Sequence, residues 1–133
     1  YYDQFAADCN ELGLTATGRT LINLMMDMGF IIDVDHMSRL MLDDVLAMAE
    51  VRRYPLVSGH SILNGSEGGH EFSLTDGQMT RIRDLGGMVT AITPKGECST
   101  SAGFAYHYRN AVAGMQKQAG DRFAAVGFST DMN

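Results

Sequence analysis

The 133-residue sequence lacks several features that would assign it to a common class of protein. It contains no Trp and only two Pro, and its net charge is −6. This charge argues against nucleic acid or an anionic membrane surface as the partner, because both favour clustered Lys and Arg. Cys9 and Cys98 form no CxxC pair and no disulfide framework, so the redox compartment stays open. No apolar run approaches the roughly 20 residues that a membrane-spanning helix needs.

Two common catalytic motifs are also missing. The glycine-rich stretch 64–69 has neither the Lys of a GxxxxGK[ST] loop nor the GxGxxG spacing, so it is not a phosphate cradle. The absence of GxSxG argues against a serine hydrolase. Apolar residues, by contrast, make up 45% of the chain, which is enough to build the packed core of one domain.

The apolar pattern alternates between helical and extended segments. Helical periodicity predicts four helices, at residues 15–29, 38–53, 75–86 and 105–119. The first three begin at residue types that cap helices, namely Thr15 or Thr17, Ser38 and Thr75. Short apolar runs predict strands at 30–35, 56–59, 88–93 and 124–128, the first of them buried on both faces. The alternation predicts an α/β fold with parallel strands, either a small open sheet or half of a closed barrel.

Polar residues follow the predicted strands at their carboxyl ends. His36 ends the first strand, His60 ends the second, and Asp131 ends the fourth. In α/β folds this edge is where sites are built, and strands about 4.8 Å apart bring such side chains within reach of one ion. One His at a strand end is more often a structural residue, but two at equivalent positions favour ligands. Two imidazoles and a carboxylate suit Zn²⁺ or a similar divalent ion.

The remaining polar candidates are weaker. Asp33 and Asp35 are ambiguous, because one can orient His36 through a hydrogen bond while the other caps the next helix. His70, in the glycine-rich loop, is a weak candidate for a substrate contact. His107 is expected on the solvated surface.

Five blocks of sequence occur in an order and spacing typical of a known family. They are LTATGR at 14–19, GFIIDVDHMS at 29–38, PLVSGHS at 55–61, LTDGQ at 74–78 and VGFSTD at 126–131. Together they resemble the membrane (renal) dipeptidase family, whose members are zinc dipeptidases of the amidohydrolase superfamily. The resemblance runs over nearly the whole chain.

The resemblance implies a (β/α)₈ TIM barrel with a binuclear zinc site, with this chain as four βα units of its second half. His36 and His60 would bind the second metal, and Asp131 would be the catalytic carboxylate near the nucleophilic water and the substrate's amino group. Bound zinc would lower the pKa of that water to about 7. The implied function is hydrolysis of a dipeptide or related amide. The alternative is a non-catalytic or tailoring relative that binds a peptide-like ligand.

Three departures from the family pattern bear on this interpretation. The family has a His-x-Asp pair in an early strand, and this chain contains none. The family also has an Arg just before the LTD block that holds the substrate carboxylate, but here that stretch reads His70-Glu71-Phe72-Ser73. Asn133 stands where the family often has a second Asp. We therefore expect residues 1–133 to be a single region, a partial barrel truncated at its N-terminus and just after the last strand. It would hold at most a partial zinc site. Alone it would be inactive, and it would need the missing half or a second copy to close.

Overall fold

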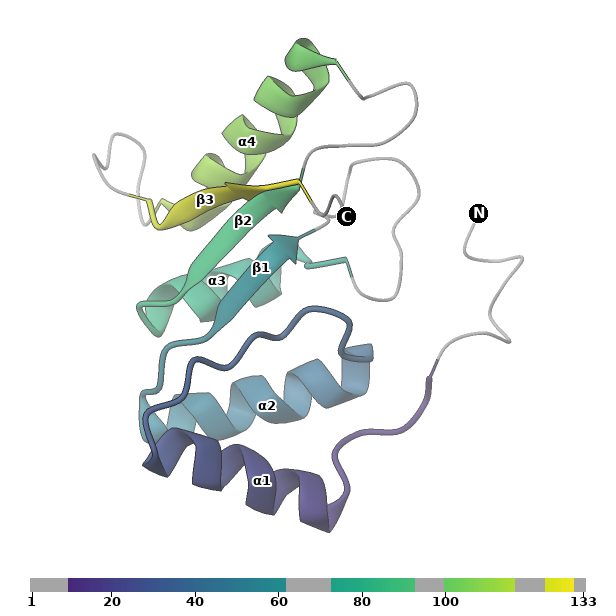
Figure 1. Ribbon diagram of the computed structural model, residues 1–133, viewed down its shortest axis with the longest axis vertical. Coiled ribbons are helices and arrows are strands. Elements are labelled where there is room, and N and C mark those ends of the chain that lie inside the picture. Colours follow the sequence, from purple (N-terminus) through teal and green to yellow (C-terminus); the bar gives the residue numbers. More distant parts are fainter. Residues whose placement is uncertain (1–9, 62–72, 93–99, 117–123, 131–133) are drawn as a thin grey trace.

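The computed structural model describes residues 10–61, 73–92, 100–116 and 124–130. The elements, in chain order, are α1 (Ala16–Asp27), α2 (Arg39–Arg52), β1 (Val57–Ser61), α3 (Asp76–Asp84), β2 (Met88–Ile92), α4 (Ser101–Met115) and β3 (Val126–Ser129). The strands form a parallel sheet in the order β1-β2-β3, and α3 and α4 are the crossover helices (Figure 1). The predicted α/β class with parallel strands is confirmed.

The helices begin where local capping bonds start them. The side chains of Thr15, Ser38 and Thr75 each accept a hydrogen bond from the backbone N–H three residues further on. Thr15, and not Thr17, is thus the cap of α1. At α3 the Gln78 side chain also accepts from the Thr75 N–H, which completes a capping box. Helix α4 begins earlier than predicted, because Thr100 caps it.

The stretch predicted as the first strand, residues 30–35, is present only as one parallel bridge between Asp33 and Val57. The Val57 N–H donates to the Ile32 carbonyl and the Val34 N–H donates to the Val57 carbonyl. Ile32 and Val34 are buried while Ile31 is 77% exposed, so this stretch is covered on one face only. The prediction that this stretch is buried on both faces was therefore wrong for the described chain. Among the described residues, only β1 pairs with the stretch.

The core lies between the sheet and the helices that follow its strands. Helices α3 and α4 pack on β2, α2 packs beside α3, and α1 packs on α2 (Figure 1). Leu46, Leu56, Ile82 and Val89 are fully buried between these layers. Gly87 lets β2 enter this core, because a Cβ there would lie 2.2 Å from the carbonyl oxygen of Leu56. This packing fixes the direction in which the carboxyl ends of the strands point.

No helix in the described ranges is both long and apolar enough to cross a bilayer.

Candidate functional site

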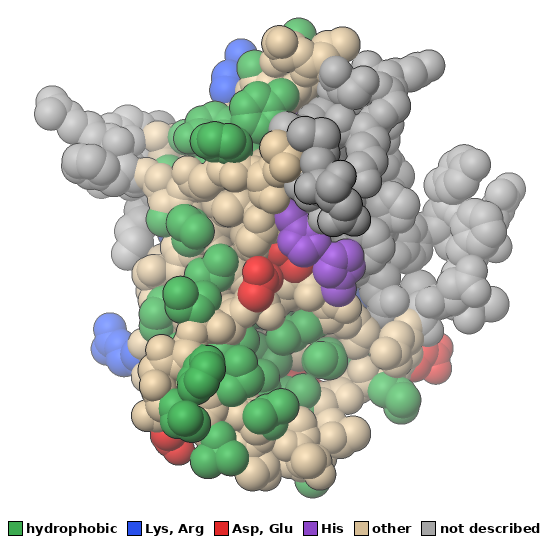
Figure 2. Space-filling view, in the orientation of Figure 1, with side chains coloured by type: hydrophobic (Ala, Val, Ile, Leu, Met, Phe, Trp, Pro, Cys, Tyr) green, Lys and Arg blue, Asp and Glu red, His purple; other side chains and the backbone are tan. Residues whose placement is uncertain are grey.

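The carboxyl end of β1 brings His36 and His60 together. Their Nε2 atoms lie 2.6 Å apart, and the ring centroids lie 4.7 Å apart with the planes tilted by 45°. Figure 2 shows histidine side chains next to each other, with acidic side chains beside them. His60 belongs to β1, whereas His36 lies in the loop between the Asp33 bridge and α2. The two residues that the sequence singled out as ligands thus point their distal nitrogens at each other.

Asp35 connects the two segments through His60. Its Oδ2 atom lies 3.1 Å from His60 Nδ1 and accepts the His60 backbone N–H at 2.6 Å. Its Oδ1 atom accepts a hydrogen bond from the Ser58 hydroxyl. Thr90 on β2 donates to the Ser58 carbonyl at 3.2 Å, so the contact extends into the sheet. The Asp35 carboxylate thus orients His60, whereas the sequence had suggested that one of Asp33 and Asp35 orients His36.

Asp33 fastens the same loop to β1. Its Oδ1 atom accepts the backbone N–H groups of Asp35 at 3.0 Å and of Gly59 at 3.4 Å. Gly59 permits this approach, because a Cβ there would lie 2.5 Å from Asp33 Oδ2. Neither carboxylate caps α2, since Ser38 does so.

His36 has an unusual backbone conformation. Its φ angle is 62°, in the left-handed region that non-glycine residues rarely occupy. The Met37 N–H donates to the Val34 carbonyl at 3.3 Å, which closes a tight turn around Asp35 and His36. A left-handed backbone costs a residue with a Cβ roughly 1–2 kcal/mol. Such strain is concentrated at functional sites, and here the residue with this conformation is the one whose imidazole faces His60.

Burial governs the electrostatics of this cluster. It raises the pKa of the Asp35 carboxyl, while the hydrogen bonds from Ser58 and from the His60 N–H lower that pKa in part. The nearby Asp33 charge raises the pKa further, and His60 acts in the opposite direction.

The donor set is chemically suited to a metal but is not a complete site. Within the ranges that the structure describes, no group of three or more His, Cys, Asp or Glu side chains is placed to hold an ion. Two imidazole nitrogens that face one point, one ring being held by a carboxylate, are the chemistry that zinc ligands use. Two nitrogens on one tetrahedral Zn²⁺ lie about 3.3 Å apart. The rings would therefore separate by roughly 0.7 Å to admit the ion. Asp131 and His70 lie outside the described residues.

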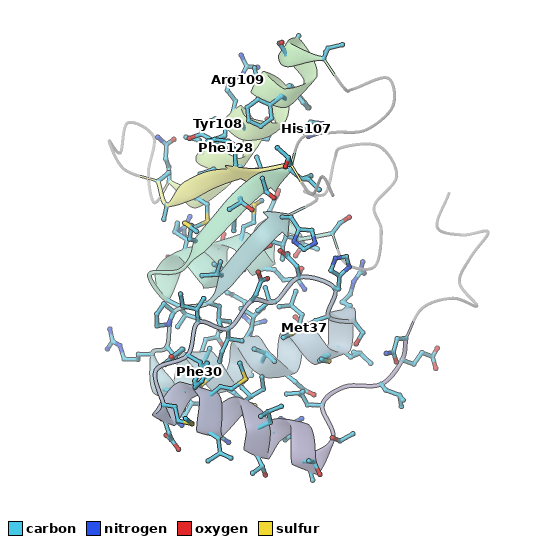
Figure 3. The ribbon with its side chains drawn as sticks, viewed as in Figure 1. Phe30, Met37, His107, Tyr108, Arg109 and Phe128 are labelled. Atoms are coloured by element: carbon cyan, nitrogen blue, oxygen red, sulfur yellow. The ribbon has the colours of Figure 1, made fainter. Side chains whose placement is uncertain are left out.

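His107 is buried, contrary to the expectation of a solvated surface position. It lies on α4 (Figure 3) with 9% of its surface exposed, and its ring meets Tyr106 edge-on at a centroid distance of 5.6 Å. Ala111 and Met115 are the other buried residues of α4. The spacing of 107, 111 and 115 is one helical stripe, so this periodicity could have placed His107 inward.

Comparison with known proteins identifies the family. The model described as Membrane dipeptidase (Peptidase family M19) matches residues 2–132. The chain belongs to the membrane dipeptidase family. This agrees with the resemblance of the five sequence blocks. A comparison with curated proteins gave no match.

Solved structures of this family resemble part of the chain. The probable dipeptidase PvdM from Pseudomonas aeruginosa is 32% identical, with a TM-score of 0.54 over 61% of this chain and 19% of its own. A metallo peptidase from Rhodobacter sphaeroides, liganded with a phosphinate mimic of the dipeptide L-Ala-D-Ala, is 31% identical, with a TM-score of 0.54 over 61% of this chain and 22% of its own. The metallo peptidase named dipeptidase AC gives 31% identity and a TM-score of 0.54, over 61% and 23%. The match thus spans about a fifth of each relative.

Proposed function

We propose that this chain supplies part of the metal-binding edge of a dipeptidase-like amidohydrolase, which hydrolyses a dipeptide or a related amide through a zinc-activated water. The observation that carries the proposal is the pair of Nε2 atoms of His36 and His60, facing each other at the carboxyl edge of a parallel sheet. Family membership supports it, since two solved relatives are described as metallo peptidases and one of these is liganded with a dipeptide mimic.

The proposed roles are those that the family resemblance implies. His36 and His60 hold the metal through Nε2, and Asp131 handles the proton of the reaction and seats the substrate's α-amine. The metal, when bound, polarises the scissile carbonyl and lowers the pKa of its water to about 7. The loop at 33–36 keeps His36 opposite His60 before any ligand arrives.

The proposal requires ligands beyond the two histidines that the described residues bring together. Catalytic zinc sites generally use three protein ligands and keep one position open, whereas the described residues bring two imidazoles together. Sheet pairing points the same way, because among the described strands β3 pairs with β2 alone. We propose that the missing half of a barrel, or a second copy of this chain, completes both the sheet and the ligand set.

Zinc titration of the chain and of three single variants tests the metal site. Zn²⁺ binding is measured calorimetrically for the original chain, His36→Ala, His60→Ala and the control His107→Gln, each checked for folding by circular dichroism. We expect both alanine variants to lose the zinc site and the control to keep it, because His107 lies on α4, apart from the pair. Unchanged zinc binding in both alanine variants would contradict the proposal.

Activity assays test the need for completion. With Zn²⁺ and a panel of dipeptides, we expect the chain alone to show no enzyme-level turnover. Enzyme-level turnover by the chain alone would overturn the idea that it is a partial barrel. In the full-length parent, binding of a dipeptide mimic without any turnover would favour the non-catalytic relative instead.

A further inference from the structure

The Asp35–His60 contact determines more than the position of the ring. A neutral imidazole carries one proton, on Nδ1 or on Nε2, and the nitrogen without it offers the lone pair that binds a metal. Asp35 Oδ2 lies 3.1 Å from His60 Nδ1, within hydrogen-bond range, and the Asp35 side chain is only 9% exposed. A carboxylate without its own proton can only accept at this contact.

Other donors hold Asp35 in this orientation. Oδ1 accepts the hydroxyl of Ser58, a residue with no exposed surface, and Oδ2 also accepts the His60 backbone N–H at 2.6 Å. Two donors on β1, Ser58 and His60, therefore hold the Asp35 carboxylate in this orientation. Asp33, although close, bonds to backbone N–H groups of the loop and of Gly59 and makes no contact with the ring of His60 that could replace Asp35.

We propose that Asp35 is a positioning residue for His60: it accepts the Nδ1–H of the ring and so keeps the proton off Nε2, the nitrogen that faces His36. The role in metal binding rests on the proposed function, whereas the choice of tautomer does not. With its proton on Nδ1, His60 can only accept at the contact between the two Nε2 atoms, so His36 Nε2 must be the donor in that hydrogen bond. His60 is therefore the ring already prepared as a ligand, whereas the Nε2 proton of His36 would have to move to Nδ1 or leave the ring before His36 Nε2 could bind an ion.

Nitrogen NMR tests this without any metal. Long-range proton–nitrogen correlation on the uniformly labelled chain distinguishes a protonated from an unprotonated ring nitrogen. The His60 signals are assigned by their loss in His60→Gln. In the original chain, at a pH where the ring is neutral, we expect His60 to carry its proton on Nδ1 and to have an unprotonated Nε2. A proton on Nε2 of His60 in the original chain would overturn the proposal.

Variants then separate positioning from general structural support. Asp35→Ala should move the His60 proton to Nε2 or leave a mixture, whereas the matched control Asp33→Asn should leave it on Nδ1. The control keeps an oxygen that can accept both backbone bonds. An unchanged tautomer in folded Asp35→Ala would also overturn the proposal.

Zinc titration of the same proteins gives the second readout. We expect Asp35→Ala to weaken Zn²⁺ binding about 10–100-fold, as is typical when the hydrogen-bond partner of a ligating His is lost. If the chain binds no Zn²⁺ but His60 keeps the Nδ1 tautomer, the proposed metal site fails and the role of Asp35 stands. If Zn²⁺ binds through His60 but the His60 tautomer is the same with and without Asp35, the proposed metal site stands and the role of Asp35 fails.

Discussion

His36 Nε2 lies 2.6 Å from His60 Nε2, although 24 positions separate the two residues in the sequence. Each residue is held by a different device. His60 is part of β1 and bonded to Asp35, whereas His36 sits in a left-handed turn that the loop must impose. The contact between the two histidines is thus a product of tertiary structure. The Asp35 bond and the turn at His36 can each be removed by a separate substitution.

At position 36 glycine should be less destabilising than alanine, and either substitution removes a ligand. The φ angle of 62° is unfavourable for any residue with a Cβ but not for glycine. In urea unfolding, we expect His36→Gly to be about 1 kcal/mol more stable than His36→Ala. Zinc titration should show both variants without the site.

Arg53 provides a matched control for this prediction. Its φ angle is 52°, and it ends α2, away from the histidine pair. Arg53→Gly should bring a comparable gain over Arg53→Ala in urea unfolding and leave zinc binding unchanged. A glycine advantage at 53 but none at 36 would show that the loop relaxes around His36 and stores no strain.

Gly87→Ala should be among the most damaging single-methyl additions in the described chain. The new Cβ would lie 2.2 Å from the Leu56 carbonyl oxygen and 2.8 Å from Ile82 Cγ2. Because the first neighbour is backbone, β1 and β2 must move apart, and we expect a loss of roughly 3 kcal/mol or more in the free energy of unfolding.

Gly29→Ala is the comparison for that loss. Gly29 has a φ of 74° and nothing within 4 Å of a built Cβ, so only backbone strain is added, at a cost of about 1 kcal/mol. Urea unfolding curves of the two variants measure the difference. Equal losses would mean that the contact between Gly87 and Leu56 is not tight in solution.

Acid should weaken the attachment of the segment before α1 to α2. The Leu14 N–H donates to Asp44 at 2.8 Å and Arg19 bonds to it at 2.7 Å, and these contacts lower the pKa of that carboxyl. A folded-state pKa below the unfolded value means that the contribution is present above about pH 4 and is lost as the pH falls through the folded pKa. Asp44→Ala should therefore be less stable than the original chain at pH 7, and the difference should shrink at low pH.

Urea unfolding at several pH values measures this loss. Glu50, whose pKa is lowered by its bond to Arg81, should behave in the same direction. A difference between the original chain and Asp44→Ala that stays constant down to about pH 2 would show that the carboxylate charge plays no part.

The sequence by itself determined the helices and the family. Ser38 and Thr75 were predictable caps, and Thr15 was one of two candidates with Thr17, because each cap bonds to an N–H three residues away and needs only a local stretch of chain. The α/β class followed from the alternation of patterns, and the five blocks gave the family that the comparison established. His36 and His60 were also recognisable as residues at the ends of extended stretches.

Tertiary structure alone decided how these residues meet. The stretch 30–35 has the composition of a strand, yet strand pairing needs neighbours, and among the described residues it has β1 on one side only. His107 is buried because α4 turns one stripe towards the core. Asp35 contacts His60, on β1, through both the ring and the backbone N–H, although His36 is its neighbour in the sequence. A contact between residues 25 positions apart depends on the packing of the whole sheet, and no local pattern encodes it.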